Sequence, residues 1–403
     1  MTARTAEGWG ATPALPATHF TDGRIYRDDT VFAEEQARIF AKVWKIACHE
    51  SEIPNPGDYR TAEQAGVPLV VVRGEDGTIR SFVNVCSHRG ARVVHEPSGN
   101  AKHFTCFYHL WSYDTRGACI AIPRPDAYEK AGLDKSKLGL RAVRTETRLG
   151  LVFINLDDAA MPLADWLGDA LEAFEEVLTI NDLQVFTYQH ATIDANWKEW
   201  QETNLDLYHE YMHVALRRTQ TNPAAMAERE LIVYPNGHIR GGGAGYKANY
   251  KDYKGWEGRS DSHALKGLTA ADFRFTHVFP NSAMNARGTV MRISTFTPLS
   301  THRTRIEWRG LGPKGQSPED WKLRSKHYAQ YWGPFGRNVP EDLLAAELCE
   351  WNFHNGAAKY QVLAREENMR GQDDGFLRAF YAQWGKLMGR SASDPFGDGR
   401  KNQ

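Results

Sequence analysis

"CSHRGARVV" at residues 86–94 and "CFYHLW" at residues 106–111 each contain a cysteine followed closely by a histidine. The two pairs are Cys86 with His88 and Cys106 with His109, in the arrangement C-x-H-x17-C-x2-H. Both lie in a region of short β-type runs broken by turn residues, where loops at strand ends can bring ligands to one point. The stretch therefore predicts a metal site within a β-rich domain.

Two kinds of metal site are compatible with two cysteines and two histidines. A tetrahedral zinc ion accepts this set, but zinc fingers usually present both cysteines first and both histidines later, on a helix. Here each half is mixed, which favours a [2Fe–2S] cluster with two thiolates on one iron and two imidazoles on the other. Neutral imidazoles reduce the negative charge of the cluster and raise its reduction potential. The doubled pair thus predicts an electron relay.

The bulk composition excludes several other classes of protein. The chain has 403 residues, enough for two or three domains, with 49 basic and 50 acidic residues. This balance lacks the basic excess of a nucleic-acid binder, and the longest apolar runs are too short to span a membrane. No secretory signal is recognised, and five cysteines are an odd, sparse set for a disulfide framework. We therefore expect a cytoplasmic protein.

Hydrophobic periodicity predicts a coarse order of elements. "VPLVVVRGEDGTIRSFVNV" predicts a β-hairpin across "GEDG". Further β-type segments are expected at 185–193, 231–240, 274–280, 288–298 and 303–311. Helices are expected at 31–44, 162–178, 197–216, 318–331, 340–354 and 374–388. Asn196 with Glu199 resembles a capping box for the helix at 197–216.

A second metal site is indicated by "ETNLDLYHEYMH" in that helix. Glu202, Asp206, His209 and His213 recur at steps of four, three and four, which places them on one helical face. His209 and His213, at i and i+4, can chelate one metal ion. Two histidines and one carboxylate leave open positions on Fe(II) for dioxygen and substrate.

The two motifs together resemble a known family. The two cysteine–histidine pairs resemble the Rieske motif, including Arg89-Gly90 after the first histidine and Trp111 after the second. Rieske electron carriers of the respiratory type have an additional cysteine in each ligand loop, whereas this chain has Ser87 and Phe107–Tyr108 there. The chain resembles the catalytic α subunit of Rieske non-heme iron oxygenases. The resemblance implies an α+β fold, in which an all-β Rieske domain at 45–160 is inserted in a helix-grip catalytic domain with an antiparallel sheet. Residues 1–44, an N-terminal arm and helix, and 161–403 would form that catalytic domain.

The resemblance also implies roles for residues of the second site. Asp206 would bridge His209 to His109 of the neighbouring subunit. "GPFGRNVPED" at 333–342 resembles the family segment that supplies the third iron ligand, which nominates Asp342, with Glu341 and Glu347 as alternatives. The family usually has four residues between the two iron histidines, whereas this chain has three. The shorter spacing suits a regular α-helix.

The implied activity is hydroxylation by O2, with electrons from NAD(P)H delivered by a separate reductase, with or without a ferredoxin. The implied assembly is a homotrimer or an α3β3 complex with a small β subunit, without nucleic-acid or membrane partners. The segments "SEIPNPGDY" at 51–59 and "GNAKHFTCFYH" at 99–109 most resemble oxygenases of salicylate-type and terephthalate-type aromatic acids, and Arg292 lies where acid-using relatives carry an arginine. Oxidation or demethylation of a small amine, ether or sulfonate is an alternative. A pure Rieske electron carrier is a rival of another class, with about two irons per chain instead of about three.

Overall fold

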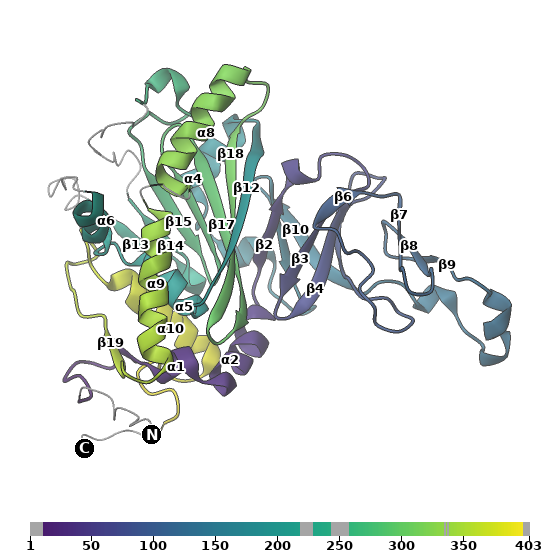
Figure 1. The fold of residues 1–403 in the computed structure, drawn as a ribbon, viewed down its shortest axis with the longest axis horizontal. Helices are drawn as coiled ribbons and strands as arrows, with labels where there is room; N and C mark the ends of the chain where they lie inside the picture. Colours follow the sequence, from purple (N-terminus) through teal and green to yellow (C-terminus); the bar gives the residue numbers. More distant parts are fainter. Residues whose placement is uncertain (1–10, 218–228, 243–257, 334–335, 337, 398–403) are drawn as a thin grey trace, which may run out of the picture. The chain divides into compact units, whose positions relative to one another are not determined.

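The computed structural model describes residues 11–217, 229–242, 258–333, 336 and 338–397 (Figure 1). Two compact units are distinguished by their internal contacts. Phe40–Leu163 form one unit, and the described residues on both sides of it in the sequence form the other. The first unit begins earlier than the expected residue 45 because Gln64 Nε2 donates hydrogen bonds to the carbonyl oxygens of Phe40 and Val43.

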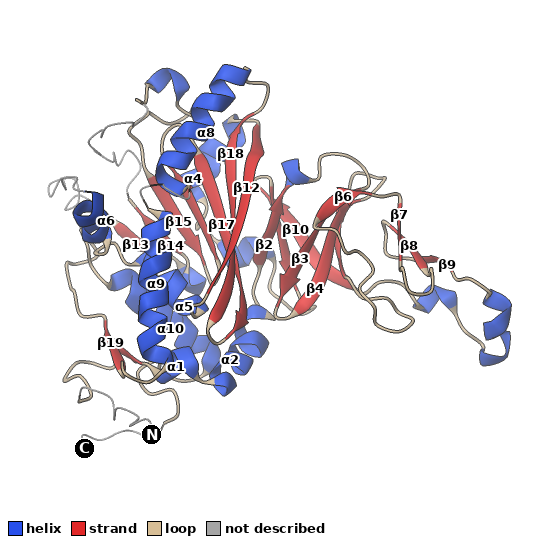
Figure 2. Ribbon diagram, viewed as in Figure 1, coloured by secondary structure: helices blue, strands red, loops and turns tan. Residues whose placement is uncertain are grey.

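The Phe40–Leu163 unit is built from antiparallel strands (Figure 2). Its larger sheet has the order β2-β11-β10-β5-β4-β3-β6, and a smaller sheet has the order β7-β8-β9. The hairpin expected across "GEDG" is formed by β4 and β5. The bounds are β2 Lys45–His49, β3 Asp58–Gln64, β4 Val67–Arg73, β5 Ile79–Val83, β6 Ser98–Asn100, β7 His103–Thr105, β8 Ser112–Asp114, β9 Cys119–Ala121, β10 Ala142–Arg148 and β11 Leu151–Asn155.

The second unit contains a seven-stranded antiparallel sheet with helices packed against it (Figure 2). The strand order is β12-β18-β17-β16-β15-β14-β13. The bounds are β12 Leu183–Ile193, β13 Leu231–Val233, β14 Ile239–Gly241, β15 Arg274–Val278, β16 Ser282–Ala286, β17 Met291–Ser300 and β18 Arg303–Pro313. Helices α8 Pro318–Trp332, α9 Val339–His354 and α10 Gly375–Met388 begin and end within two residues of the expected bounds.

One face of this sheet carries the helices that position the site. On α5 (Trp197–Leu205), the ring of Trp197 lies 6.0 Å from Phe296 of β17, and Trp200 lies 6.0 Å from Trp308 of β18. On α10, the ring of Phe380 lies 6.2 Å from His277 of β15. Alternate strand residues share a face, so these aromatic contacts identify the face of the sheet that packs against α5 and α10.

The N-terminal segment belongs to the same unit as α5 and α10. β1 (Phe20–Asp22) pairs with β19 (Tyr360–Val362), and α1 (Arg24–Arg27) and α2 (Asp29–Glu35) follow. The carboxylate of Glu35, at the end of α2, is fully buried and pairs with Lys198 Nζ at 2.8 Å. It also accepts hydrogen bonds from the indole N–H groups of Trp197 and Trp384. A buried charge needs such partners, so this ion pair fixes the N-terminal helices on the catalytic unit.

Three expected helices are shorter or broken in the structure. The helix predicted at 31–44 ends as α2 at Glu35 and continues only as a π-helical turn, Gln36–Phe40. The helix predicted at 162–178 is two helices, α3 Leu163–Leu167 and α4 Glu172–Ile180, because Gly168 between them has φ +48°. The helix predicted at 197–216 is also two, α5 and α6 (Glu210–Arg217), separated at Asp206–His209.

No helix among the described residues combines the length and the apolar composition needed to cross a membrane.

Candidate metal centres

The two cysteine–histidine motifs form two similar turns. Cys86 and Cys106 are buried. The backbone N–H of Cys86 donates to the carbonyl oxygen of Ala91, and that of Cys106 donates to the carbonyl oxygen of Trp111, both at 2.8 Å. The carbonyl oxygens of the two cysteines accept from Gly90 N–H and Leu110 N–H, both at 2.9 Å. Gly90 has φ +73° and Leu110 has φ +60°, so both loops reverse through the left-handed region. The repeated pair in the sequence is thus a repeated turn in the fold.

The side chains of the two turns converge. The imidazole rings of His88 and His109 lie 4.5 Å apart, centroid to centroid. His88 stacks on Trp111 at 4.7 Å with an interplanar angle of 5°. The Nδ1 atom of His88 is buried and has no hydrogen-bond partner within the described chain. Two adjacent imidazoles, one with an unsatisfied ring nitrogen, beside two buried thiols fit a [2Fe–2S] cluster with mixed ligation.

Tyr113 supports this site and was not recognised in the sequence. Its hydroxyl accepts a hydrogen bond from Ser87 N–H at 3.0 Å and lies 3.2 Å from Cys86 Sγ. Burial and the hydrogen bond with Cys86 raise the pKa of Tyr113, so the hydroxyl keeps its proton and can donate it to the sulfur. Hydrogen bonds to cluster sulfurs raise the reduction potential. The "LWSYD" segment gave no signal of this contact.

The second candidate centre consists of His209, His213 and Asp342. His209 Nε2 lies 3.1 Å from His213 Nε2 and 3.3 Å from Asp342 Oδ1, and His213 Nε2 lies 3.2 Å from the same oxygen. Three cis ligands of an octahedral ion, each at about 2.2 Å, are separated by about 3.1 Å. The triangle therefore has the dimensions of the two-histidine, one-carboxylate site typical of Fe(II). Among the described residues, His209, His213 and Asp342 form the group of histidine, cysteine or carboxylate side chains whose ligand atoms lie close enough together to bind one metal ion.

Each ligand is positioned by a different element. His209 lies in the turn between α5 and α6, and His213 lies one turn into α6. Asp342 lies in the first turn of α9, where the helix dipole favours a carboxylate. Residues 334, 335 and 337 of the "GPFGRNVPED" segment fall outside the described residues.

The electrostatics of this triad favour a cation. Burial alone would raise the pKa of Asp342, but hydrogen bonds from His209 and His213 outweigh it and lower the pKa. Burial likewise tends to lower the pKa of His209, but the hydrogen bond and charge of Asp342 raise it to about 9. The ligand set holds an anionic carboxylate and attracts positive charge, so these residues fit a divalent metal ion.

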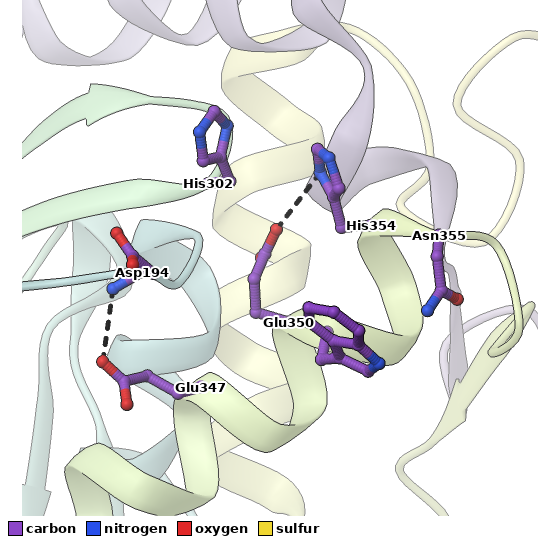
Figure 3. Close-up of a pocket in the computed structure, with 7 residues that line it drawn as sticks. Asp194, His302, Glu347, Glu350, His354 and Asn355 are labelled. Atoms are coloured by element: carbon purple, nitrogen blue, oxygen red, sulfur yellow. Dashed lines mark hydrogen bonds and ion pairs between the residues drawn. The ribbon is translucent and has the colours of Figure 1, made fainter.

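The two alternative ligands, Glu341 and Glu347, have other partners. Glu341 Oε2 lies 2.5 Å from His213 Nδ1, the ring nitrogen that does not face Asp342. A carboxylate on the outer nitrogen of a metal-binding histidine fixes its tautomer and orientation. Glu347 lines a separate cavity of about 480 Å³, where its Oε1 accepts from the backbone N–H of Asp194 at 3.3 Å (Figure 3). Glu347 is therefore not placed with the triad.

Asp206 adjoins the triad through its backbone. Nδ1 of His209 contacts the main-chain carbonyl oxygen of Asp206, whereas the family resemblance led us to expect the side-chain carboxylate. Asp206 Oδ1 instead accepts from the backbone N–H groups of Tyr208 at 2.7 Å and His209 at 3.3 Å. The difference follows from the break between α5 and α6, which turns the carbonyl toward the ring. Glu202, expected on the same face, is buried with Tyr26 and Tyr381.

Arg292 lies on β17, on the same face of the catalytic sheet as Phe296, which packs against α5. Its side chain is 5% exposed, and its guanidinium carbon lies 5.0 Å from the ring centroid of Trp332. Burial lowers the pKa of Arg292 to about 10, while the charges of Tyr328 and Asp342 oppose this shift. Arg292 therefore remains a cation at neutral pH, close enough to the triad for its charge to interact with Asp342.

Comparisons with known proteins bear on both centres. A family model described as the Rieske [2Fe-2S] domain matches residues 43–139, and one described as the ring hydroxylating alpha subunit (catalytic domain) matches residues 180–389. The chain is 47% identical to the α subunit of 2-aminobenzenesulfonate 2,3-dioxygenase from Alcaligenes sp., over 94% of this chain and 96% of the relative.

A second relative and a solved structure agree with these matches. The chain is 37% identical to the hydroxylase α subunit of methanesulfonate monooxygenase from Methylosulfonomonas methylovora, over 98% of this chain and 97% of the relative. The crystal structure of naphthalene 1,2-dioxygenase from Rhodococcus sp., bound to indole, superposes with a TM-score of 0.78 at 24% identity. The superposition covers 91% of this chain and 94% of the naphthalene dioxygenase chain. At this identity, the similarity shows a shared fold alone.

Proposed function

The chain belongs to the Rieske ring-hydroxylating oxygenases as a catalytic α subunit, and on this premise we propose that it oxidises a small organosulfonate. Its class, a Rieske non-heme iron oxygenase with a [2Fe–2S] cluster and a mononuclear iron, follows from the family. The rival interpretation of a pure electron carrier is wrong, because the catalytic domain of the oxygenases matches residues 180–389.

The protein provides two ligand sets with different tasks. When bound, the cluster supplies electrons and the mononuclear iron activates O2. In our proposal Cys86, His88, Cys106 and His109 hold the cluster, and His209, His213 and Asp342 hold the iron. The support is the triangle of ligand atoms at 3.1–3.3 Å. These three residues would hold the iron and would leave coordination positions open for O2 and substrate.

The overall reaction needs an external electron source. Insertion of one oxygen atom converts C–H, O2, two electrons and two protons to C–OH and water. Insertion of both atoms into an arene consumes the same electrons and protons and gives a cis-diol. The electrons come from NAD(P)H through a separate reductase, since the sequence lacks a flavin or nicotinamide fingerprint. One sulfonate relative is named a dioxygenase and the other a monooxygenase, so both outcomes belong to the proposal.

Electron transfer between subunits is a further part of the proposal. Asp206 would link His209 to His109 of the next subunit, so the active assembly is a closed ring, a homotrimer or an α3β3 complex. Two features support this arrangement. The residues around His109, namely Phe107, Tyr108 and Leu110, are 66%, 52% and 57% exposed. Asp206 also lies directly beside the proposed iron ligand His209, whose Nδ1 contacts the Asp206 carbonyl oxygen.

The substrate class is inferred from the relatives and from Arg292. The expected substrate was a carboxylated aromatic compound of the salicylate or terephthalate type, with a sulfonate among the alternatives. Both relatives described above are named for sulfonates, one aromatic and one aliphatic. A buried arginine close to the triad is compatible with either anion and is unfavourable for a cationic amine. We therefore propose a sulfonate, ahead of a carboxylate or an amine, as the substrate.

The proposal is tested with the purified protein and a reductase that can reduce its cluster. Oxygen uptake and product mass are measured with 2-aminobenzenesulfonate, benzenesulfonate, methanesulfonate, salicylate, terephthalate and a quaternary amine. We expect uptake coupled to product with at least one sulfonate, and incorporation of ¹⁸O from ¹⁸O2 distinguishes one atom from two. Coupled oxidation of only the carboxylates or only the amine would reject the sulfonate assignment while leaving the oxygenase class intact.

A further inference from the structure

Two unpartnered polar groups lie together on the helix-covered face of the catalytic sheet. The first is Arg292, whose Nε atom is buried and has no hydrogen-bond partner in the described part of the chain. Arg292 pairs in register with Asn285 of β16 and with Gly310 of β18. No ion pair with a described carboxylate is formed by this arginine, although its charge interacts with that of Asp342.

The second group is the hydroxyl of Tyr328 on α8. It is buried and also lacks a hydrogen-bond partner among the described residues. A Cβ atom added at Gly310 would lie 2.8 Å from the Tyr328 ring, so the ring rests on the strand residue that is paired with Arg292. Directly opposed strand residues project to the same face, so Arg292 and Tyr328 are neighbours.

Trp332 completes the surroundings of the two groups. It lies one helical turn after Tyr328 on α8, and the two rings are 5.2 Å apart. The same indole is the one that faces the Arg292 guanidinium at 5.0 Å. Trp332 thus packs against the guanidinium from α8 without using its N–H donors.

The chemistry of the donors indicates which ligand they suit. A buried cation and a buried hydroxyl without partners are both unfavourable, so an anion that bonds to both would compensate for their lost hydration. A guanidinium fork binds two oxygens of one anion in a plane. A carboxylate has no third oxygen, whereas a sulfonate has one. The tyrosine hydroxyl is a single donor beside the fork.

We propose that Arg292 and Tyr328 form a three-oxygen subsite for the sulfonate group of the substrate, with the guanidinium on two oxygens and the hydroxyl on the third. This inference rests on the proposed function and identifies what selects a sulfonate over a carboxylate. A bound carboxylate would leave the Tyr328 hydroxyl buried and unpaired, which is the situation in which polar sites reject a closely related analogue. The charge of Asp342, a proposed iron ligand, is among the charges that act on Arg292.

The test is a comparison of matched substrates in Tyr328→Phe. Steady-state kinetics are measured with 2-aminobenzenesulfonate and with 2-aminobenzoate, which differ only in the anionic group. We expect kcat/KM for the sulfonate to fall at least tenfold, mainly through KM, while the value for the carboxylate stays within twofold. The ratio between the two substrates therefore collapses. An equal fall for both substrates, or no change for either, would overturn the proposal.

Two control variants distinguish this role from a structural one. Tyr234→Phe removes a hydroxyl that bonds to Glu172, away from the subsite, and should leave the substrate ratio unchanged. Ser294→Ala removes a buried, unpartnered hydroxyl on the same strand face, two residues from Arg292. A collapse of the ratio in Ser294→Ala but not in Tyr328→Phe would assign the third donor to Ser294 and reject Tyr328. Iron content and the visible spectrum are measured for every variant to verify that both centres are intact.

Direct binding separates this inference from the proposed function. Calorimetric titration of the holoenzyme with benzenesulfonate and with benzoate reports the subsite without turnover. Sulfonate binding that weakens at least tenfold in Tyr328→Phe supports the subsite, even if no sulfonate is oxidised and the proposed function fails. Turnover of sulfonates with equal binding to wild type and Tyr328→Phe would reject the subsite and leave the proposed function standing.

Discussion

Glu341 and Asp342 are adjacent in the sequence, yet their carboxylates have different partners. Adjacent residues of a helix project about 100° apart, so only one of the two can face both imidazoles. Asp342 faces His209 and His213, and Glu341 reaches the outer nitrogen of His213. The sequence could nominate the acidic dipeptide but could not decide between its members, because that choice depends on how α9 is rotated against α6.

Substitution of Asp342 tests the third iron ligand. In Asp342→Ala the mononuclear site loses its anionic ligand, and we expect iron to fall from about three to about two per chain, with the cluster spectrum unchanged. Iron analysis and the visible spectrum provide the measurement. Glu347→Ala is the matched control and should retain all iron, since Glu347 lies in the separate cavity of Figure 3. Full iron and activity in Asp342→Ala would refute the assignment.

Substitution of Glu341 tests the support of His213. Glu341→Gln keeps the size of the side chain but removes the charge that orients the imidazole. Loss of such a partner typically lowers metal affinity by about 10–100-fold, and we expect that range here. Equilibrium competition for Fe(II) against a chelator measures it. An affinity equal to that of the wild type would mean that the 2.5 Å contact does not tune the metal site.

Arg292 gives a prediction about substrate charge. Arg292→Gln removes the guanidinium fork, and we expect the KM for an anionic substrate to rise by an amount that corresponds to about 2–3 kcal/mol of binding. An uncharged sulfonamide or amide analogue should respond much less to the substitution. Kinetics on the anion and on the neutral analogue, in wild type and variant, provide the comparison. Equal kinetics of both proteins on the anion would exclude an ionic contact.

At the level of elements, the break between α5 and α6 is the largest departure from the expected secondary structure. Periodicity placed Asp206, His209 and His213 on one continuous helix, and these positions do lie on one side of such a helix. In the structure Asp206 has ψ 100° and its carboxylate accepts the first free N–H groups of the next turn. An aspartate can end one helix and cap another, and apolar periodicity does not detect this.

Asp206 can therefore be tested with two variants of different severity. Asp206→Asn keeps an oxygen that can cap the turn but removes the negative charge, whereas Asp206→Ala removes both. We expect Asp206→Asn to retain both metals and the cluster spectrum, while reoxidation of the reduced cluster by substrate and O2 slows strongly in single turnover. Wild-type reoxidation in Asp206→Asn would show that the carboxylate charge is not part of the electron path.

At the level of the whole molecule, sequence patterns predicted the separate parts better than the contacts between distant segments. The ligand motifs, the hairpin and the closing helices are local patterns of apolar spacing and turn residues. The ion pair of Glu35 with Lys198 joins residues 163 positions apart. Nothing in either segment specifies the other, and such pairs arise only from the tertiary packing of α2 against α5.

Electron transfer between subunits predicts complementation. Cys106→Ser should lack the cluster, and Asp342→Ala should lack the mononuclear iron, so each homo-oligomer should be inactive. When the two variants are co-expressed and isolated as mixed oligomers, an intact cluster of one subunit can serve an intact iron site of its neighbour. We expect a substantial fraction of wild-type activity. Mixed oligomers as inactive as their parents would place the electron path within one chain.

The discontinuous catalytic unit has a consequence for the order of events during synthesis. Phe40–Leu163 are complete once residue 163 has left the ribosome, and they contain all four proposed cluster ligands. The catalytic unit cannot close at that stage, because β1 at Phe20–Asp22 must wait for β19 at Tyr360–Val362. Contacts that distant form late. A nascent chain would therefore be able to receive its iron–sulfur cluster before the mononuclear iron site exists. The site that supplies electrons would be assembled before the site that uses them.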